Sequence, residues 1–161
     1  MTETAIRDGH RLFRAALLAL AYPGWPVPVT GANDHEIARA LIEASWPDST
    51  NVSTEPESAD VLLVEGPSSD GRLLKAPRGT EELPEEGATA IYIVHQPTST
   101  EVRLSGPGID GMSTVALPLT AQELTDRAVC CAHRPLGVDL LMITGGTVIG
   151  LPRSTRVEVI G

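Results

Sequence analysis

The residues best suited to chemistry form a short polar segment near the C-terminus, residues 152–156, with the sequence Pro-Arg-Ser-Thr-Arg. Arg153 and Arg156 carry planar guanidinium groups, which bind phosphate or phosphonate oxygens in pairs, and Thr155 adds a hydroxyl group. The same residues could instead anchor the chain end, or a subunit interface, to acidic side chains. Both interpretations stay open, and Arg153, Thr155 and Arg156 are the first residues to inspect for a bound anion.

Asp139 is a second unusual residue, because it stands at the start of an otherwise apolar segment. A buried carboxylate needs a partner, and Arg134 and Arg153 are the candidates. We interpret this pairing as a structural ion pair and add Asp139 and Arg134 to the candidate anion-binding or interface residues. No nucleophile, base or metal-ligand set accompanies them in the sequence, so we predict no catalytic residue.

The histidines give no sign of a metal site. His10, His35, His95 and His133 lie far apart and lack the spacing typical of metal ligands, among themselves or with the cysteines. We interpret each as a surface or hydrogen-bonded structural residue. The sequence therefore predicts neither a bound metal nor a cofactor.

The cysteines and the lysine are also interpreted as structural. Cys130 and Cys131 are adjacent, which disfavours a disulfide between them, and the chain suits a reducing cytoplasm. They end a predicted helix, where the helix dipole disfavours a thiolate, so we expect small core residues. Lys75, the single lysine, stands in a segment rich in proline and glycine, a poor setting for a buried Schiff base.

Charge and composition exclude several classes of partner. The net charge is −9, and residues 32–101 hold 14 acidic and 4 basic residues. Nucleic acids and anionic membranes bind clustered lysine and arginine, and an aromatic content of 3% leaves few stacking platforms for single strands. The acidic segment is either a solvated face or a docking surface for a basic partner. The apolar run 15–21 is too short to span a bilayer.

Three helices are predicted. The first runs from residue 6 to 20 or 21, with an apolar face formed by Leu12, Phe13, Ala16, Leu17 and Leu20. The second runs from Asn33 or Asp34 to residue 45. The third covers 121–131 and begins with a capping box formed by Thr120 and Glu123.

The predicted strands alternate with these helices. Buried strands are expected at 61–65 and 88–94, another around Val102 and Leu104, and residues 106–108 (Gly-Pro-Gly) form a tight turn. A hairpin joins strands 138–144 and 147–151 through Gly145-Gly146, a candidate type I′ turn. This alternation predicts one α/β domain over residues 1–161, with a mixed sheet flanked by helices.

Four segments together carry a resemblance to a known family: residues 10–24, 84–94, 102–109 and 135–159. In this order they resemble the PhnH subunit of the bacterial carbon–phosphorus lyase system, which degrades phosphonates, and they reach nearly from end to end of the chain. The chain departs from the family's pattern in two places. Residues 28–61 form a shorter segment than is usual, and Leu20-Ala21-Tyr22 replaces a more typical Met-Ser pair.

The resemblance implies a fold like the large domain of pyridoxal-phosphate-dependent transferases, without that cofactor. It implies a cytoplasmic homodimer that joins the G, I and J subunits and acts functionally with L. Such a subunit supports the formation of ribose 1-methylphosphonate 5-triphosphate from ATP and methylphosphonate as a non-catalytic part of a multisubunit transferase and lyase system. Two alternatives stay open: a stand-alone phosphonate- or nucleotide-binding protein or enzyme that uses Arg153–Arg156, and a dimer outside the complex.

Overall fold

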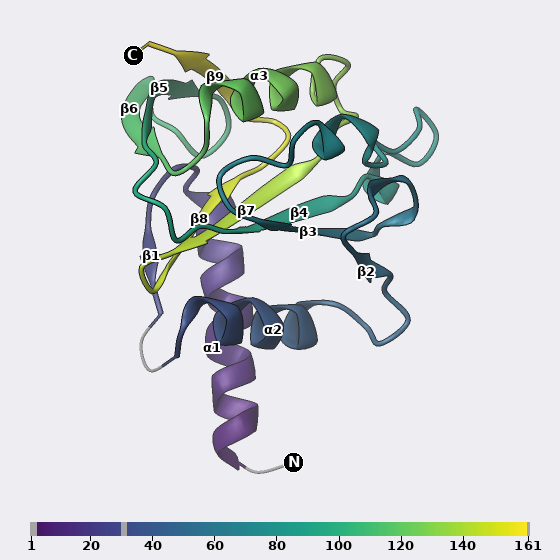
Figure 1. Ribbon diagram of the computed structural model, residues 1–161, viewed down its shortest axis with the longest axis vertical. Helices are drawn as coiled ribbons and strands as arrows, with labels where there is room; N and C mark the ends of the chain where they lie inside the picture. The colour runs from purple at the N-terminus through teal and green to yellow at the C-terminus, as the bar shows by residue number, and fades with distance from the viewer. Residues whose placement is uncertain (1–2, 30–31, 161) are drawn as a thin grey trace.

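The computed structural model describes residues 3–29 and 32–160, and its centre is a six-stranded mixed sheet. The strand order is β1-β8-β7-β4-β3-β2 (Figure 1). β2, β3, β4 and β7 are parallel, and β8 and β1 follow antiparallel to their neighbours. The bounds are β1 Val27–Pro28, β2 Val52–Ser53, β3 Val61–Glu65, β4 Thr89–Ile93, β7 Asp139–Thr144 and β8 Thr147–Leu151.

Both faces of this sheet are buried, which explains why its central strands are continuously apolar. In β4, Ala90 and Tyr92 enter one core and Ile91 enters the other. β7 follows the same alternation, with Leu140 on the first face and Leu141 on the second. The mixed sheet flanked by helices is therefore confirmed.

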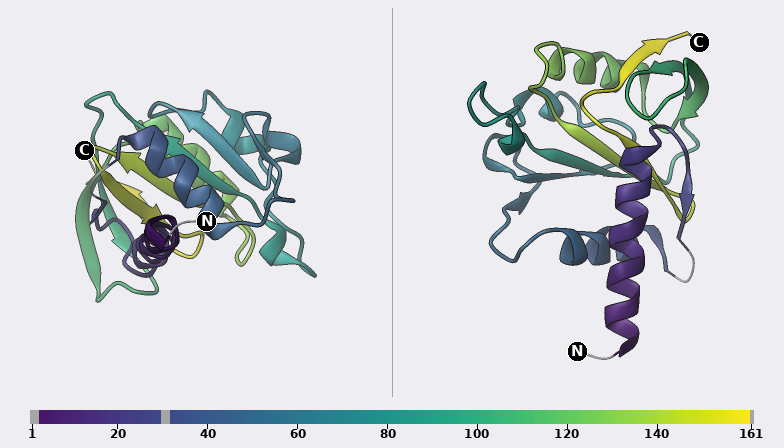
Figure 2. Two further views of the ribbon diagram at one scale, coloured as in Figure 1. Left: turned by 90° about the horizontal axis from the view of Figure 1, so that it is seen from below. Right: turned by 180° about the vertical axis from the view of Figure 1, so that it is seen from behind.

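Helices α1 (Glu3–Ala21) and α2 (Asp34–Ser45) cover one face of the sheet (Figure 1). The view from behind in Figure 2 shows α1 in front of the main sheet, with its N-terminal end extending beyond the body of the protein. The helix comes very close to β8 at Gly150, where a Cβ atom would lie 2.3 Å from the carbonyl oxygen of Ala19. Glycine is required there because any side chain would collide with the helix backbone.

Helix α3 (Ala121–Cys130) and a second sheet cover the opposite face. This sheet has the order β6-β5-β9 and is antiparallel, with β5 Thr100–Ser105, β6 Met112–Leu117 and β9 Arg156–Val159. Three short 3₁₀ helices, Pro56–Ser58, Arg72–Lys75 and Pro84–Glu86, lie in the long connections. The sequence did not predict β6, because its exposed and half-buried residues follow a glycine-rich turn and lack a strong apolar pattern.

The prediction for the apolar face of α1 is partly wrong. Leu12 and Ala16 are buried as expected, but Phe13 and Leu17 are 45% and 53% exposed. The buried face instead includes Ala15 and Ala19, whose small side chains allow the helix to approach the sheet closely. Phe13 and Leu17 lie one turn apart, so they form an exposed apolar stripe on α1.

Candidate functional site

The polar segment 152–156 links the two sheets, since β8 ends at Leu151 and β9 begins at Arg156. Arg153 is held at the amino end of β7 by the Asp139 carboxylate. Its backbone nitrogen lies 2.7 Å and its Nε 3.2 Å from Asp139 Oδ1, and its Nη2 lies 3.2 Å from Oδ2. Arg153 Nη1 also donates to the Pro84 carbonyl oxygen at 2.8 Å. Arg153 is the charged partner of Asp139, and these contacts engage both groups within the protein.

Arg134 has a different role from the one predicted. It has no contact with Asp139 among the interactions of the described residues; it donates to the carbonyl oxygens of Ser154 and Thr155 instead. Arg134 follows α3, so it reaches the linking segment from the helix side. The expected ion pair therefore forms with Arg153, and Arg134 holds the backbone of the link.

Arg127 is a residue that the sequence analysis missed. It lies on the buried face of α3 and is 2% exposed. Its Nη1 and Nη2 donate to the carbonyl oxygens of Thr155 and Pro152, both at 2.7 Å. The sequence does contain one sign of its burial. Arg127 stands three residues after Leu124 and four before Cys131, which places its charge on the apolar face of an amphipathic helix.

An open cavity of about 420 Å³ lies between α3 and β9. Three arginines line it: Arg127 of α3, Arg134 after α3 and Arg156 at the start of β9. Among the described residues that line the cavity, none carries a carboxylate. Arg156, which is exposed, is the most accessible of these cations. The lining residues are Arg127, Ala128, Cys131, Ala132, Arg134, Arg156 and Val157. This concentration of guanidinium groups suits an anion with several oxygens.

Two polar atoms beside the cavity are buried without a hydrogen-bond partner, Arg127 Nε and the hydroxyl oxygen of Thr155. Burial lowers the pKa of Arg127, and the nearby Arg134 lowers it further, while Cys131 has the opposite effect. The Thr155 side chain is fully buried, so the structure places this predicted ligand residue inside the link rather than on an open surface.

Two cysteines lie at the end of α3, and one of them, Cys131, lines this cavity. Cys130 and Cys131 are buried, as predicted. Burial raises the pKa of the Cys130 thiol to about 11, although Arg78 acts in the opposite direction. A protonated thiol is a weak nucleophile. The Cys130 thiol is therefore suited to packing in the core rather than to attack on a ligand.

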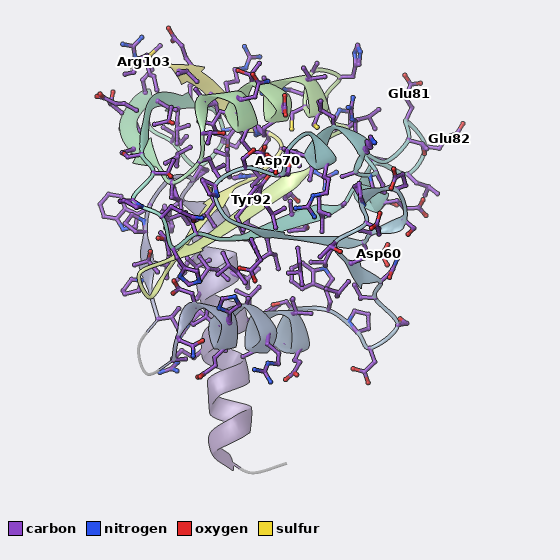
Figure 3. All side chains as sticks on the ribbon, viewed as in Figure 1. Asp60, Asp70, Glu81, Glu82, Tyr92 and Arg103 are labelled. Carbon is purple, nitrogen blue, oxygen red and sulfur yellow. The ribbon has the colours of Figure 1, made fainter. Side chains whose placement is uncertain are left out.

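Tyr92 of β4 points into the interior of the protein (Figure 3), where the buried Glu123 of α3 contacts it. Glu123 Oε2 accepts a 2.5 Å hydrogen bond from the Tyr92 hydroxyl, and Glu123 Oε1 accepts one from the Ser69 nitrogen at 3.0 Å. The predicted capping box is therefore half right. Thr120 caps the Glu123 nitrogen at 3.1 Å, but the Glu123 side chain joins the sheet and a loop to the helix. Burial and the Glu123 carboxylate raise the pKa of Tyr92 well above its usual value.

His35 and His95 are exposed, as predicted, but the structure brings these two residues together. The rings of His35 and His95 stack with their centroids 5.1 Å apart, and His35 Nε2 lies 2.8 Å from Glu65 Oε1. His133 is exposed elsewhere, after α3; the side chain of His10 lies outside the described residues. Linear spacing could not reveal the pair, because 60 residues separate its members in the sequence.

These features define an α/β protein whose candidate site is rich in arginine and whose buried polar groups fix its own architecture. None of the described helices combines the length and the apolar character that crossing a bilayer requires. The family model for the bacterial phosphonate metabolism protein PhnH matches residues 47–158, and the chain belongs to this family.

A relative of known sequence agrees with this assignment over a longer range. The chain is 34% identical over 168 aligned residues to the putative C-P lyase subunit protein HtxG of Stutzerimonas stutzeri. The alignment covers 92% of this chain and 85% of the relative. The resemblance found in the sequence is therefore confirmed at the level of the family.

Proposed function

We propose that this protein is a non-catalytic subunit of a carbon–phosphorus lyase complex, with partners corresponding to the G, I and J subunits and a functional link to L. In this role it supports the formation of ribose 1-methylphosphonate 5-triphosphate from ATP and methylphosphonate in the cytoplasm. Membership of the phosphonate metabolism family carries the proposal. The name of the relative, which is itself a putative C-P lyase subunit, points in the same direction.

The surface near α1 supports a role in assembly. Phe13 and Leu17 form the exposed stripe, and Tyr22 and Trp25, directly after the helix, are 57% and 68% exposed. Three of the five aromatic residues of the chain are thus on the surface in or just after one helix. Exposed aromatic and large apolar side chains mark protein interfaces, where their burial contributes much of the binding energy.

We assign the α1 stripe to contact with one of the other subunits of the complex. The acidic middle segment is a second proposed docking surface, suited to a basic partner. Figure 3 shows Glu81 and Glu82 of this segment at one edge of the molecule, and both are exposed. Electrostatic complementarity of this kind increases the rate and specificity of association.

We also propose that the fold is of the kind found in the large domain of pyridoxal-phosphate-dependent transferases, without use of that cofactor. Lys75 supports this proposal, because the only lysine of the chain is exposed at the end of a 3₁₀ helix. A Schiff-base lysine is normally activated by burial or by a neighbouring cation.

Co-expression tests the assembly. The tagged chain should co-purify with the G, I and J subunits, and Phe13→Asp with Leu17→Asp should weaken this association at least tenfold. Val129→Asp is the matched control, because Val129 is 50% exposed on α3, which packs on the opposite face of the main sheet from α1. A wild-type chain that never enters the complex would overturn the proposal, whereas a normal association of the double variant would overturn only the assignment of the stripe.

The arginine-lined cavity favours a second candidate function, the direct binding of a phosphonate or a nucleotide. Arg156 is the best probe, since Arg153 is engaged by Asp139 and Arg134 by backbone carbonyls. Calorimetry of the isolated protein with ATP and with methylphosphonate should show binding that Arg156→Ala weakens. Arg39→Ala removes one exposed charge from α2 and is the matched control. Equal weakening by both variants would show that only net charge matters.

A further inference from the structure

His35, Glu65 and His95 meet at the carboxyl-terminal edge of the parallel strands. Glu65 is the last residue of β3, His95 follows the end of β4 by two residues, and His35 lies in the first turn of α2. Each residue offers one ligand atom, and the three atoms lie within 4.8 Å of one another. We propose that these residues form a binding site for a divalent transition-metal ion with the ligand preferences of Zn²⁺, a site that the assembly function does not require.

The backbone that carries two of the ligands is fixed by the sheet. The Gly66 nitrogen, directly after Glu65, donates to the Ile93 carbonyl oxygen at 2.8 Å. The Val94 nitrogen, directly before His95, donates to the Ile143 carbonyl oxygen at 2.9 Å. These bonds continue the ladder from β3 through β4 to β7, so both ligand side chains start from rigid positions. A metal site benefits from such support because its ligands need little ordering on binding.

Asn33 and Asp34 fix the position of His35. The Asn33 side chain caps α2 by accepting a hydrogen bond from the Glu36 nitrogen at 2.9 Å. Asp34 is buried, and its two carboxylate oxygens accept hydrogen bonds from the Gly145 and Gly146 nitrogens at 3.2 and 3.0 Å. The turn between β7 and β8 thus locks the first turn of α2 against the sheet edge.

Asp34 also supports His95 from the protein side. Its Oδ2 lies 3.7 Å from His95 Nδ1, and the carboxylate is buried while the imidazole is about half exposed. Metal-binding histidines commonly use one ring nitrogen for the ion and direct the other at a carboxylate, which orients the ring and increases its basicity. Asp34 is placed to act in this way on His95 and is a positioning residue in our proposal.

The chemistry of the three ligands selects the kind of ion. Two imidazoles and one carboxylate suit Zn²⁺ and related transition metals, whereas Mg²⁺ and Ca²⁺ prefer oxygen ligands alone. Zinc bonds of about 2.0–2.2 Å place neighbouring tetrahedral ligands about 3.4 Å apart. The exposed side chains need to move by little more than 1 Å from their present separation. Three protein ligands also leave a position for water or for an anionic oxygen.

A surface hydrogen bond alone would explain only part of this arrangement. A half-exposed His35–Glu65 contact contributes little free energy. It does not account for a second imidazole stacked on the first with an interplanar angle of 28°. A shared ion would hold both rings beside the same carboxylate and would balance the negative charges of Glu65 and Asp34.

Competition with a chromophoric chelator tests the site in the tag-free, metal-depleted full-length chain. We expect one equivalent of Zn²⁺ per chain and an affinity at least tenfold lower in His35→Ala, His95→Ala and Glu65→Gln. His133→Ala is the matched control, because His133 is also exposed but lies outside the proposed site, close in sequence to both cysteines. Its replacement should leave the affinity for Zn²⁺ unchanged. Circular dichroism of each variant should match that of the wild type, since all three ligands are exposed.

Two further readouts complete the test. Co²⁺ should give visible absorption bands of low-symmetry, four- or five-coordinate cobalt in the wild type, and these bands should be absent in His95→Ala. Mg²⁺ in large excess should not displace Zn²⁺. The proposal is overturned if Zn²⁺ fails to saturate at one equivalent, if the His35 and His95 variants bind as tightly as the wild type, or if Mg²⁺ competes on equal terms.

Discussion

Replacement of the buried Arg127 by methionine tests the physical core of the arginine cluster. The substitution keeps an unbranched side chain against the apolar residues of α3 but removes both hydrogen bonds to the link between β8 and β9. A hydrogen bond from a charged donor contributes about 1.5–3 kcal/mol. The same substitution relieves the desolvation of a guanidinium group, which offsets part of this loss.

The carbonyl oxygens decide the size of the effect. The Pro152 carbonyl oxygen loses its Arg127 donor and keeps only the Thr155 amide at 3.0 Å, while the Thr155 carbonyl oxygen retains a longer contact of 3.4 Å with Arg134. The net expectation is a decrease of about 2–4 kcal/mol in the free energy of unfolding. With a urea dependence of about 2 kcal/mol per molar, the midpoint should fall by roughly 1–2 M.

Urea unfolding followed by circular dichroism measures this change, and hydrogen exchange localises it. The Thr155 amide donates to the Pro152 carbonyl oxygen at 3.0 Å, so its protection should fall with the loss of the link. Arg39→Met, on the exposed side of α2, should change stability by less than about 0.5 kcal/mol. If Arg127→Met is as stable as this control, Arg127 does not hold the link and our explanation of its burial fails.

Three further predictions concern the supporting structure. A double-mutant cycle of Asp139→Ala and Arg153→Ala should give a coupling free energy of at least about 1 kcal/mol. Of the two single variants, Asp139→Ala should lower the free energy of unfolding more, because Asp139 also accepts a hydrogen bond from the Arg153 backbone nitrogen. Additive effects would contradict the ion pair. Gly150→Ala should lower the free energy of unfolding by about 1–3 kcal/mol, because the new Cβ would lie 2.3 Å from the Ala19 carbonyl oxygen. Thermal unfolding measures this change, and an unchanged melting temperature would disprove the close approach. Folding raises the Cys130 pKa from 9.0 to about 11, so the neutral thiol contributes fully to stability below pH 9 and loses this contribution as the pH rises toward 11. The unfolding free energy of Cys130→Ala should therefore decline less steeply at alkaline pH than that of the wild type. Parallel pH profiles of the two proteins would contradict this prediction.

The local patterns of the sequence predicted most of the main sheet. The apolar segments at 61–65 and 88–94 and the glycine hairpin correspond to β3, β4, β7 and β8 within about one residue. Gly145 and Gly146 both have positive φ, as a type I′ turn requires. These features could be predicted because each depends on residues that are neighbours in the chain.

The site residues depend on contacts between distant segments, and here the sequence was a weaker guide. The need of a buried carboxylate for a partner suggested Arg134 or Arg153 for Asp139, and the structure pairs it with Arg153. Arg127 was missed because its partners are backbone carbonyls, which have no sequence signature. His35 and His95 meet only because α2 packs beside the ends of β3 and β4, a tertiary arrangement that no spacing rule contains.

The exposed stripe on α1 illustrates a different limit. Phe13 and Leu17 fit an amphipathic pattern as well as Leu12 and Ala16 do, and periodicity alone could not say which apolar residues face the sheet. The close approach of α1 to β8 selected the alanines for the core. The larger residues were left on the surface, where we propose that a partner subunit covers them.

Native mass spectrometry of the assembly tests the central claim most directly. The tagged chain would be co-expressed with the G, I and J subunits, purified through its tag, and weighed intact beside the Phe13→Asp/Leu17→Asp variant and the Val129→Asp control. Our account predicts a defined complex that contains all four subunits for the wild type and the control, and a free chain for the double variant. A wild-type chain that is recovered alone, with no bound subunit, would contradict the account.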